Sequence, residues 1–228
     1  MTAIIGHASR GAAFLSTDTR RRDHSTGQLR EQRKLHQWSN QVLIAQGGAG
    51  TGAADVVLAS LWENQKRIGP DVDAVEAAIA EVAPPLMACA IQKWRGEGKT
   101  IPATKLILAS VCTDSNSGMI RAIDLASGMC VHESKAPQPY MTGSDTPAIV
   151  SAVSEEFHRL RDTSGAFSFD CLAVNAIMRL SVSHACDIQL PADVGSVRWD
   201  PSTNSWAVRI ERGLNALAVP DPAFRASA

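Results

Sequence analysis

The spacing of apolar residues changes repeatedly along this 228-residue chain, and the order of these changes restricts the folds open to it. Alternating or continuous apolar runs typical of strands occupy residues 2–7, 12–18, 42–46, 104–112, 118–125, 128–133, 195–200 and 205–212. Helix-type spacing occupies residues 52–67, 71–94, 145–160 and 169–185. Blocks of hairpin-forming strands, separated by pairs of helices, favour stacked layers over alternating βαβ units.

This order predicts an α+β fold in which two packed sheets are covered by helices on both outer faces, a four-layer αββα sandwich. Residues 1–228 show no internal repeat, low-complexity segment or linker, so one domain is expected. The polar stretch that ends at Gln32 predicts a long loop. Pro84 and Pro85 are expected to kink or break the second helix, because proline lacks an N–H group and clashes with the preceding turn.

Composition excludes several classes of protein. The formal net charge is −1, so no overall field favours nucleic acid or an anionic membrane. The longest apolar runs are interrupted by charge or proline, so no transmembrane helix is expected, and the first residues do not have the layout of a secretory signal. Five scattered cysteines without CxxC spacing predict neither a zinc site nor a disulfide framework, and six dispersed histidines form no metal-ligand pattern. We therefore expect a cytoplasmic protein without a metal, a cofactor, a nucleic-acid partner or a membrane partner.

Two local patterns suggest other functions. The segment GGAGTGAAD follows a strand and opens a helix, as a dinucleotide-binding loop does. However, Ala53 stands where the third glycine of G-x-G-x-x-G is required, and no Gly-Lys-Ser/Thr follows. A basic run between Arg20 and Lys34 suggests nucleic acid, but it has neither an aromatic stacking surface nor a basic pI to accompany it. A solvated basic loop explains most of that run.

Thr2 is the residue that most directly suggests chemistry. A threonine hydroxyl is a weak nucleophile until a base removes its proton, and one known base is the residue's own α-amino group. That amine titrates near pH 8, so part of it is neutral under physiological conditions. Removal of Met1, which is ordinary before a small residue, would make Thr2 the amino terminus. Taken alone, Thr2 is equally well explained as a β-favouring residue at the start of a strand.

Four elements near the start of the chain resemble the β-type subunits of the proteasome and its bacterial homologues of the HslV, Anbu and BPH types, which are N-terminal nucleophile (Ntn) hydrolases. The mature family sequence begins Thr-(Thr/Ser)-Ile-(Val/Ile)-Gly, and residues 2–6 read TAIIG. LSTDTR supplies Asp18 at the family's distance from the threonine, and QRKLHQW supplies Lys34. VLIAQGGAG places Gly48 at the family's oxyanion position.

The resemblance implies a role for each of these residues. Thr2 Oγ would attack a carbonyl carbon, and its own amine would carry the proton. Lys34 would lower the pKa of the hydroxyl, and Asp18 would keep Lys34 charged and oriented. The backbone N–H of Gly48 would stabilise the oxyanion.

The second half of the chain follows the family pattern less closely. Ser144 matches the serine of a Gly-Ser-Gly turn, although Asp145 replaces the second glycine. Asp187 matches the aspartate of a family Asp-x-x-Ser loop, but Leu190 stands at the serine position. Ser181 and Ser183 are the nearest upstream hydroxyls that could substitute for that serine.

The resemblance also assigns substrate contacts. In the family, the residue two before the oxyanion glycine lies at the floor of the first substrate pocket, and here that residue is Gln46. A pocket that tolerates polar side chains is expected. The substrate-binding residues implied in this way are Arg20, Arg21, His36, Gln46 and Gly50.

These observations predict a self-compartmentalising threonine endopeptidase that forms a ring, with a double ring as the expected assembly, and hydrolyses peptides or unfolded proteins. Whether an ATP-dependent unfoldase is a partner stays open. Two alternatives also stay open: a ring-forming assembly protein of the same fold without peptidase activity, and an Ntn amidase that acts on a small amide.

Overall fold

The structure, a computed structural model, describes residues 2–22, 26–47, 52–98, 103–134, 139–142, 147–164, 169–184 and 188–215. One antiparallel sheet of five strands has the order β10-β1-β2-β11-β12. Its strands are β1 (Ile4–Ser9), β2 (Ala12–Asp18), β10 (Pro139–Thr142), β11 (Ala192–Asp200) and β12 (Ser205–Leu214). The first strand of the chain therefore lies inside a sheet, between β10 and β2, so its backbone is paired on both sides.

The second antiparallel sheet also has five strands, in the order β5-β6-β7-β8-β9. They are β5 (Leu35–Gln37), β6 (Leu43–Gly47), β7 (Lys105–Cys112), β8 (Ser117–Asp124) and β9 (Cys130–Ser134). Two short strands, β3 (Arg20–Arg22) and β4 (Leu29–Glu31), pair only with each other in the part of the chain that the structure describes. They lie within the segment that the sequence predicted to be loop.

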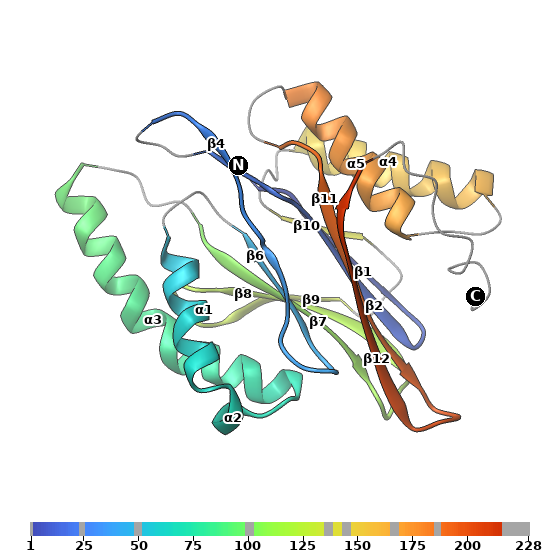
Figure 1. Cartoon of the computed structure of the whole chain (residues 1–228), viewed down its shortest axis with the longest axis horizontal. Coiled ribbons are helices and arrows are strands. Elements are labelled where there is room, and N and C mark those ends of the chain that lie inside the picture. Colours follow the sequence, from blue (N-terminus) through green and yellow to red (C-terminus); the bar gives the residue numbers. More distant parts are fainter. Residues whose placement is uncertain are drawn as a thin grey trace.

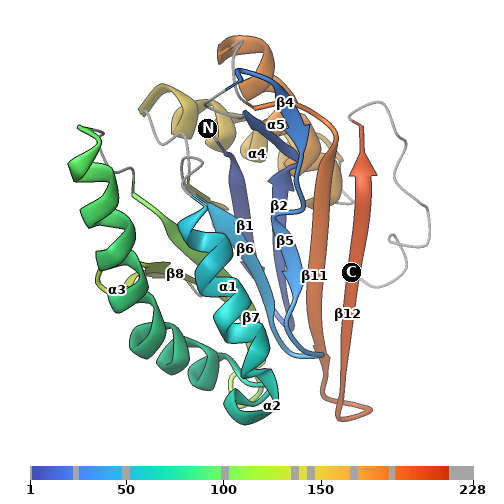
Figure 2. The ribbon, with the colours of Figure 1, turned by 60° about the vertical axis from the view of Figure 1, so that its left-hand side comes forward.

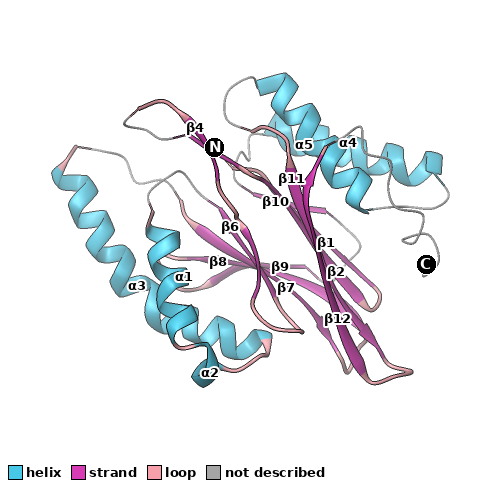
Figure 3. Ribbon diagram, viewed as in Figure 1, coloured by secondary structure: helices cyan, strands magenta, loops and turns pink. Residues whose placement is uncertain are grey.

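The helices form two groups on opposite sides of the sheets (Figure 1; Figure 3). The first group is α1 (Ala53–Glu63), α2 (Gln65–Ile68) and α3 (Val72–Gly96), and the second is α4 (Pro147–Ser164) and α5 (Phe169–His184). The four predicted helical segments are thus confirmed with small changes at their ends, except that the first is divided at Asn64 into α1 and α2. The mixed α/β arrangement of two antiparallel sheets with helices is confirmed as well.

Alternation of side chains along the strands divides the apolar core into three clusters. Ile5 on β1 packs with residues of α4 and α5, whereas its neighbour Ile4 packs between the two sheets. On β6, Leu43 lies in the same inter-sheet cluster, and Ile44 packs with α1 and α3. Each of these strands is buried on both faces, which explains their continuous apolar sequences.

The two sheets approach each other closely at Gly118 on β8. A Cβ atom at this position would lie 1.9 Å from the carbonyl oxygen of Ala12 on β2, so only glycine fits there. An isolated bridge between Arg10 and Ser117 lies beside this contact. The end of the β1–β2 hairpin is therefore fixed against the second sheet by backbone contact.

Helix α3 continues through Pro84 and Pro85 instead of ending there. Figure 2 shows it bent along its length, which agrees with the predicted kink and not with a break. Its Val75, Ile79, Ala83 and Met87 are buried on both sides of the proline pair, so packing holds the helix together. By length and composition alone α3 could cross a membrane, contrary to the expectation from interrupted apolar runs. This is weak evidence, because a core-facing helix meets the same criterion.

Candidate active site

The pairing of β1 with β2 brings Asp18 beside the start of the chain. The backbone N–H of Asp18 donates to the carbonyl oxygen of Ala3, at 3.3 Å, and the Ala3 N–H donates to Asp18 Oδ1, at 2.9 Å. Asp18 has no exposed surface. Its carboxylate is therefore held against the peptide group that directly follows Thr2.

Lys34 approaches the same carboxylate from the other sheet, since it lies immediately before β5. Its Nζ donates to Asp18 Oδ2 at 2.9 Å and to the carbonyl oxygen of Arg20. The Lys34 residue is 3% exposed. A buried ammonium is tolerated when a buried carboxylate and further hydrogen bonds satisfy it, and both conditions are met here.

Two opposing effects act on the Asp18 carboxyl group. Burial raises the pKa of Asp18 above its ordinary value, while the charge and hydrogen bond of Lys34 and the N–H groups of Ala3 and Arg20 act to lower it. Lys34 and the two backbone N–H groups therefore stabilise the charged form of Asp18, and burial opposes it.

Thr2 directly precedes Ala3, whose N–H donates to Asp18, so Thr2 lies next to this ion pair. Thr2 is 7% exposed. The structure therefore brings Thr2, Asp18 and Lys34, three of the predicted catalytic residues, to one location. The predicted catalytic residues Gly48, Ser144 and Asp187, and the predicted substrate-binding residue Gly50, lie outside the described residues.

Gln46 connects the ion pair to helix α1. Its backbone N–H donates to the carbonyl oxygen of Lys34 at 2.9 Å, and its side-chain Nε2 lies 3.1 Å from Asp55 Oδ1. Gln32 Nε2 donates to the same Asp55 oxygen at 3.0 Å. Asp55 and Gln32 were not predicted as site residues. Asp55 could have been noticed because it is an acidic residue in the first turn of a helix that follows a glycine-rich segment. The amino-terminal end of a helix favours a negative charge.

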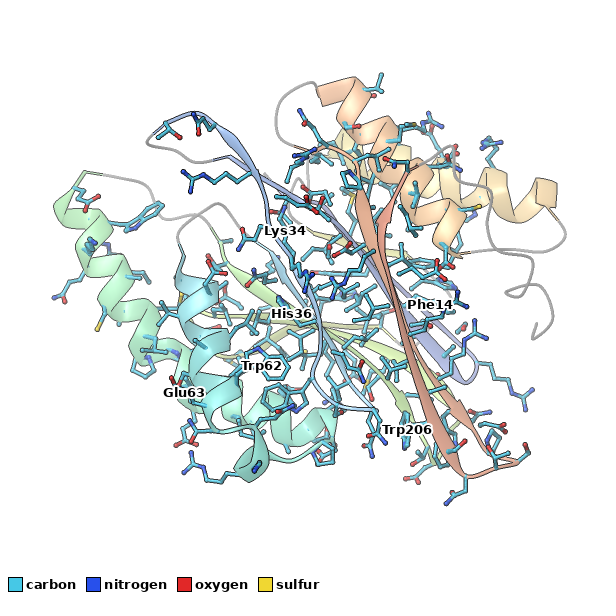
Figure 4. All side chains as sticks on the ribbon, in the orientation of Figure 1. Phe14, Lys34, His36, Trp62, Glu63 and Trp206 are labelled. Atoms are coloured by element: carbon cyan, nitrogen blue, oxygen red, sulfur yellow. The ribbon has the colours of Figure 1, made fainter. Side chains whose placement is uncertain are left out.

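The remaining predicted substrate contacts lie at or near this point. Arg20 supplies its carbonyl oxygen to Lys34, and its Nε atom is buried without a hydrogen-bond partner among the described residues. Arg21 pairs with Arg30 in the β3–β4 hairpin. His36 is the second residue of β5, two positions after Lys34, and Figure 4 shows both side chains near the centre of the molecule.

His36 is held in its neutral form by its surroundings. Burial and the nearby cations Arg212 and Arg33 lower the pKa of His36, and Asp55 and Asp193 act in the opposite direction. Arg212 is itself bound to the Asp193 carboxylate. At neutral pH the imidazole is therefore a hydrogen-bonding group without charge.

Leu190 stands at the position where the family pattern has a serine. Its side chain packs against the apolar cluster formed by β1, β11, α4 and α5. The next residue, Pro191, accepts hydrogen bonds from both the N–H and the hydroxyl of Thr19, at 3.2 and 2.8 Å. Of the two suggested substitutes, Ser181 donates to Met178 within its own helix and Ser183 is exposed, so the structure does not support either in the serine's role.

The described residues contain no group of three or more His, Cys, Asp or Glu side chains that could hold a metal ion. The arrangement that they do form is a buried carboxylate–ammonium pair at a threonine near the chain start. Such a pair can lower the pKa of a neighbouring hydroxyl and stabilise negative charge that develops there.

No protein-family model matches the chain, and no curated protein matches its sequence. Among solved structures, it is similar to the Anbu (Gly-1) mutant from Hyphomicrobium sp. strain MC1, with a TM-score of 0.59. The two proteins share a fold. The match covers 98% of this chain and 90% of that chain at 15% sequence identity. It supports the expected proteasome-like Ntn fold, and it does not favour the HslV or BPH types.

Proposed function

We propose that this chain is a threonine-type peptidase of the proteasome-like Ntn fold, with the four-layer αββα arrangement of that fold. The observation that carries the proposal is the buried Asp18–Lys34 pair, which is hydrogen-bonded to the peptide group next to Thr2. The fold shared with Anbu supports it independently.

The proposed reaction requires that Met1 is removed. Thr2 Oγ then attacks the carbonyl carbon of a peptide bond, and the free α-amine of Thr2 accepts the hydroxyl proton. The same amine returns this proton to the leaving amine as the peptide bond breaks, which leaves an acyl ester on Thr2. Water hydrolyses the ester, again with the amine as base, and restores Thr2. Lys34 contributes positive charge beside the nucleophile, and Gly48 is proposed as the oxyanion donor.

The wider setting of this activity is part of the same proposal. We propose that the chain forms a ring, most simply a double ring, whose inner chamber receives peptides or unfolded proteins in the cytoplasm. Ser144 and Asp187 are proposed to orient the amine, and Arg21 and Gly50 to contact substrate.

A second candidate rests on Leu190. Because an apolar side chain occupies the family's serine position, the amine of Thr2 has one fewer hydroxyl to orient it. A ring-forming protein of the same fold without turnover is therefore the alternative, and an Ntn amidase for small amides is a third possibility.

Treatment with an N-terminal threonine-directed electrophile, an epoxyketone or a boronate, tests these candidates. The peptidase requires an intact mass without Met1, labelling of Thr2, and loss of peptide hydrolysis in both the labelled protein and Thr2→Ala. Thr203→Ala, in the exposed turn between β11 and β12, is the matched control and keeps activity. A correctly trimmed Thr2 that is not labelled, in a protein that hydrolyses no peptide, would contradict the mechanism and favour the assembly protein. Labelling with turnover of small amides only would favour the amidase.

A further inference from the structure

Strand β12 forms one margin of the first sheet, and its outer edge has no strand beside it among the described residues. Its inner edge pairs with β11 along its length. None of the ten residues of β12 is buried, whereas all seven residues of β2 in the same sheet are. Figure 2 shows β12 at the margin of the described part of the molecule. Such an edge presents a row of backbone N–H and C=O groups that can pair with a further strand.

One face of β12 is apolar and only partly covered. Trp206, Val208 and Ile210 pack against the cluster between the two sheets while they stay partly exposed. The Trp206 ring lies 5.0 Å from that of Trp199, and Figure 4 shows Trp206 close to the turn between β11 and β12. A strand added beside β12 would bury part of this apolar surface, which is favourable.

The opposite face of β12 carries two opposite charges. Arg209 and Glu211 are two positions apart, so they share a face, and they form an ion pair there. The Oε1 atom of Glu211 is nevertheless buried without a hydrogen-bond partner among the described residues. Asp170 at the start of α5 is a second buried carboxyl group that faces Glu211, and Arg198 and Arg209 face it as well. A further N–H donor from outside the chain would satisfy the Glu211 oxygen.

Antiparallel pairing of two β12 strands has a register that matches these charges. With a two-fold axis at Ile210, Arg209 of each copy lies opposite Glu211 of the other copy. An axis at Arg209 would place the two guanidinium groups opposite each other, and like charges in that position are destabilising. An axis at Val208 would leave Arg209 opposite the uncharged Ala207. Charge complementarity therefore selects the axis at Ile210.

We propose that two copies of this chain pair through β12, antiparallel and with the two-fold axis at Ile210, which joins their first sheets into one sheet. The contact uses the same surface of both copies, so it closes with two copies and does not by itself build a ring. It is additional to the proposed ring contacts. It uses none of the proposed catalytic residues, so it stands separately from the peptidase proposal.

Cysteine cross-linking measures the register directly. In Ile210→Cys the two thiols meet at the axis, where Cα atoms of opposite residues lie about 4.5–5.5 Å apart, as a disulfide requires. Val208→Cys is the matched control on the same face, because the two copies of this position are four residues apart, about 13 Å along the strand. After mild oxidation, peptide mass spectrometry should find the introduced thiols linked in Ile210→Cys only. A link in Val208→Cys, or none in Ile210→Cys, would overturn the proposal.

Charge variants separate pairing between copies from the ion pair within one copy. Arg209→Glu and Glu211→Arg each place like charges opposite each other, so the apparent Kd of pairing should rise about tenfold or more in sedimentation velocity. An equal mixture of the two variants should associate as tightly as the wild type. In the mixture every glutamate faces an arginine of the other variant, although the ion pair within each chain is still lost.

Arg95→Glu, at an exposed position near the end of α3, is the matched charge control and should leave the Kd unchanged. An unchanged Kd in both β12 variants, or a mixture that does not associate, would overturn the proposal. A wild-type protein without this contact at any concentration, as expected if residues 216–228 cover β12 instead, would also overturn it.

Assembly mass separates this inference from the proposed function. If the chain also forms a ring, Arg209→Glu should lower the mass of the assembly to half or less, and an unchanged mass would contradict pairing through β12. Because pairing is scored by mass and cross-linking, a protein that pairs but hydrolyses no peptide would retain this inference and remove only the peptidase proposal.

Discussion

Replacement of Lys34 by methionine removes the cation of the buried pair while keeping a side chain of similar length. Asp18, which has no exposed surface, then loses the hydrogen bond from Nζ at 2.9 Å and retains the Ala3 N–H. The variant has two ways to fold: with an unpaired buried carboxylate, which costs about 3–5 kcal/mol, or with Asp18 protonated.

Protonation sets an upper limit to this cost. With an ordinary pKa of 3.8 in the unfolded chain, binding a proton to Asp18 at pH 7 costs about 4 kcal/mol, and at pH 5 about 2 kcal/mol. Because Lys34→Met raises the folded pKa of Asp18 still further above its unfolded value, the stabilising form is complete at low pH and is lost as the pH rises. We therefore expect Lys34→Met to lose about 4 kcal/mol of unfolding free energy at pH 7 and about half of that at pH 5.

Urea unfolding of the wild type and Lys34→Met at pH 5, 6 and 7 measures this difference. Other groups that titrate in this range do so in both proteins and cancel. The double variant Asp18→Asn, Lys34→Met is the control: its neutral amide still accepts the Ala3 N–H, so it should regain most of the stability and lose the pH dependence. A loss below about 1 kcal/mol at pH 7, or an equal loss at pH 5 and pH 7, would refute the argument that the pair is buried and mutually dependent.

Three further predictions concern other buried groups. Burial lowers the pKa of His7 from 6.5 to about 4, so its contribution of about 3 kcal/mol is present above pH 6.5 and is lost as the pH falls towards 4, and His7→Phe should flatten this dependence in urea unfolding. Burial and then Glu211 raise the pKa of Asp170 from 3.8 to about 6, which destabilises the fold as the pH rises through this range. Asp170→Asn should therefore raise Tm at pH 7.5 and have little effect at pH 4. Gly118→Ala should lower stability by about 3 kcal/mol or more, as measured by Tm, because its Cβ would meet backbone and not a side chain.

The sequence predicted the elements whose physical causes are local. Apolar periodicity located the main helices and the long strands. The grouping of Thr2, Asp18 and Lys34 was implied by the family resemblance, and the structure brings these three residues together. The β3–β4 hairpin was missed because its arginine-rich strands have no apolar alternation, and they pair only with each other among the described residues. Strand β10 was missed because it has just four residues and is defined by its pairing with β1.

The parts of the site that could not be predicted depend on contacts between distant segments. Asp55 is an ordinary acidic residue in a helix until the fold places it against Gln32 and Gln46. Because Gln46 Nε2 is bound to Asp55, Gln46 Oε1 is left buried without a hydrogen-bond partner among the described residues, and no feature of the sequence predicts this. Likewise, Leu190 packs against an apolar cluster that includes residues of α5 and β11, and the sequence around Leu190 does not predict this contact.

The hydrogen bond between the Ala3 N–H and Asp18 has a consequence for the chain end as a whole. Terminal residues of most domains fray, because few contacts restrain them. Here the N–H of Ala3 donates to the carboxylate of Asp18, and Lys34 from the opposite sheet stabilises the charge of that carboxylate. Melting of the extreme terminus would expose this carboxylate and separate the lysine from its partner, so local opening there is coupled to the packing of the two sheets. The hydrogen bonds of Asp18 and the packing of the two sheets are therefore expected to be kept or lost together.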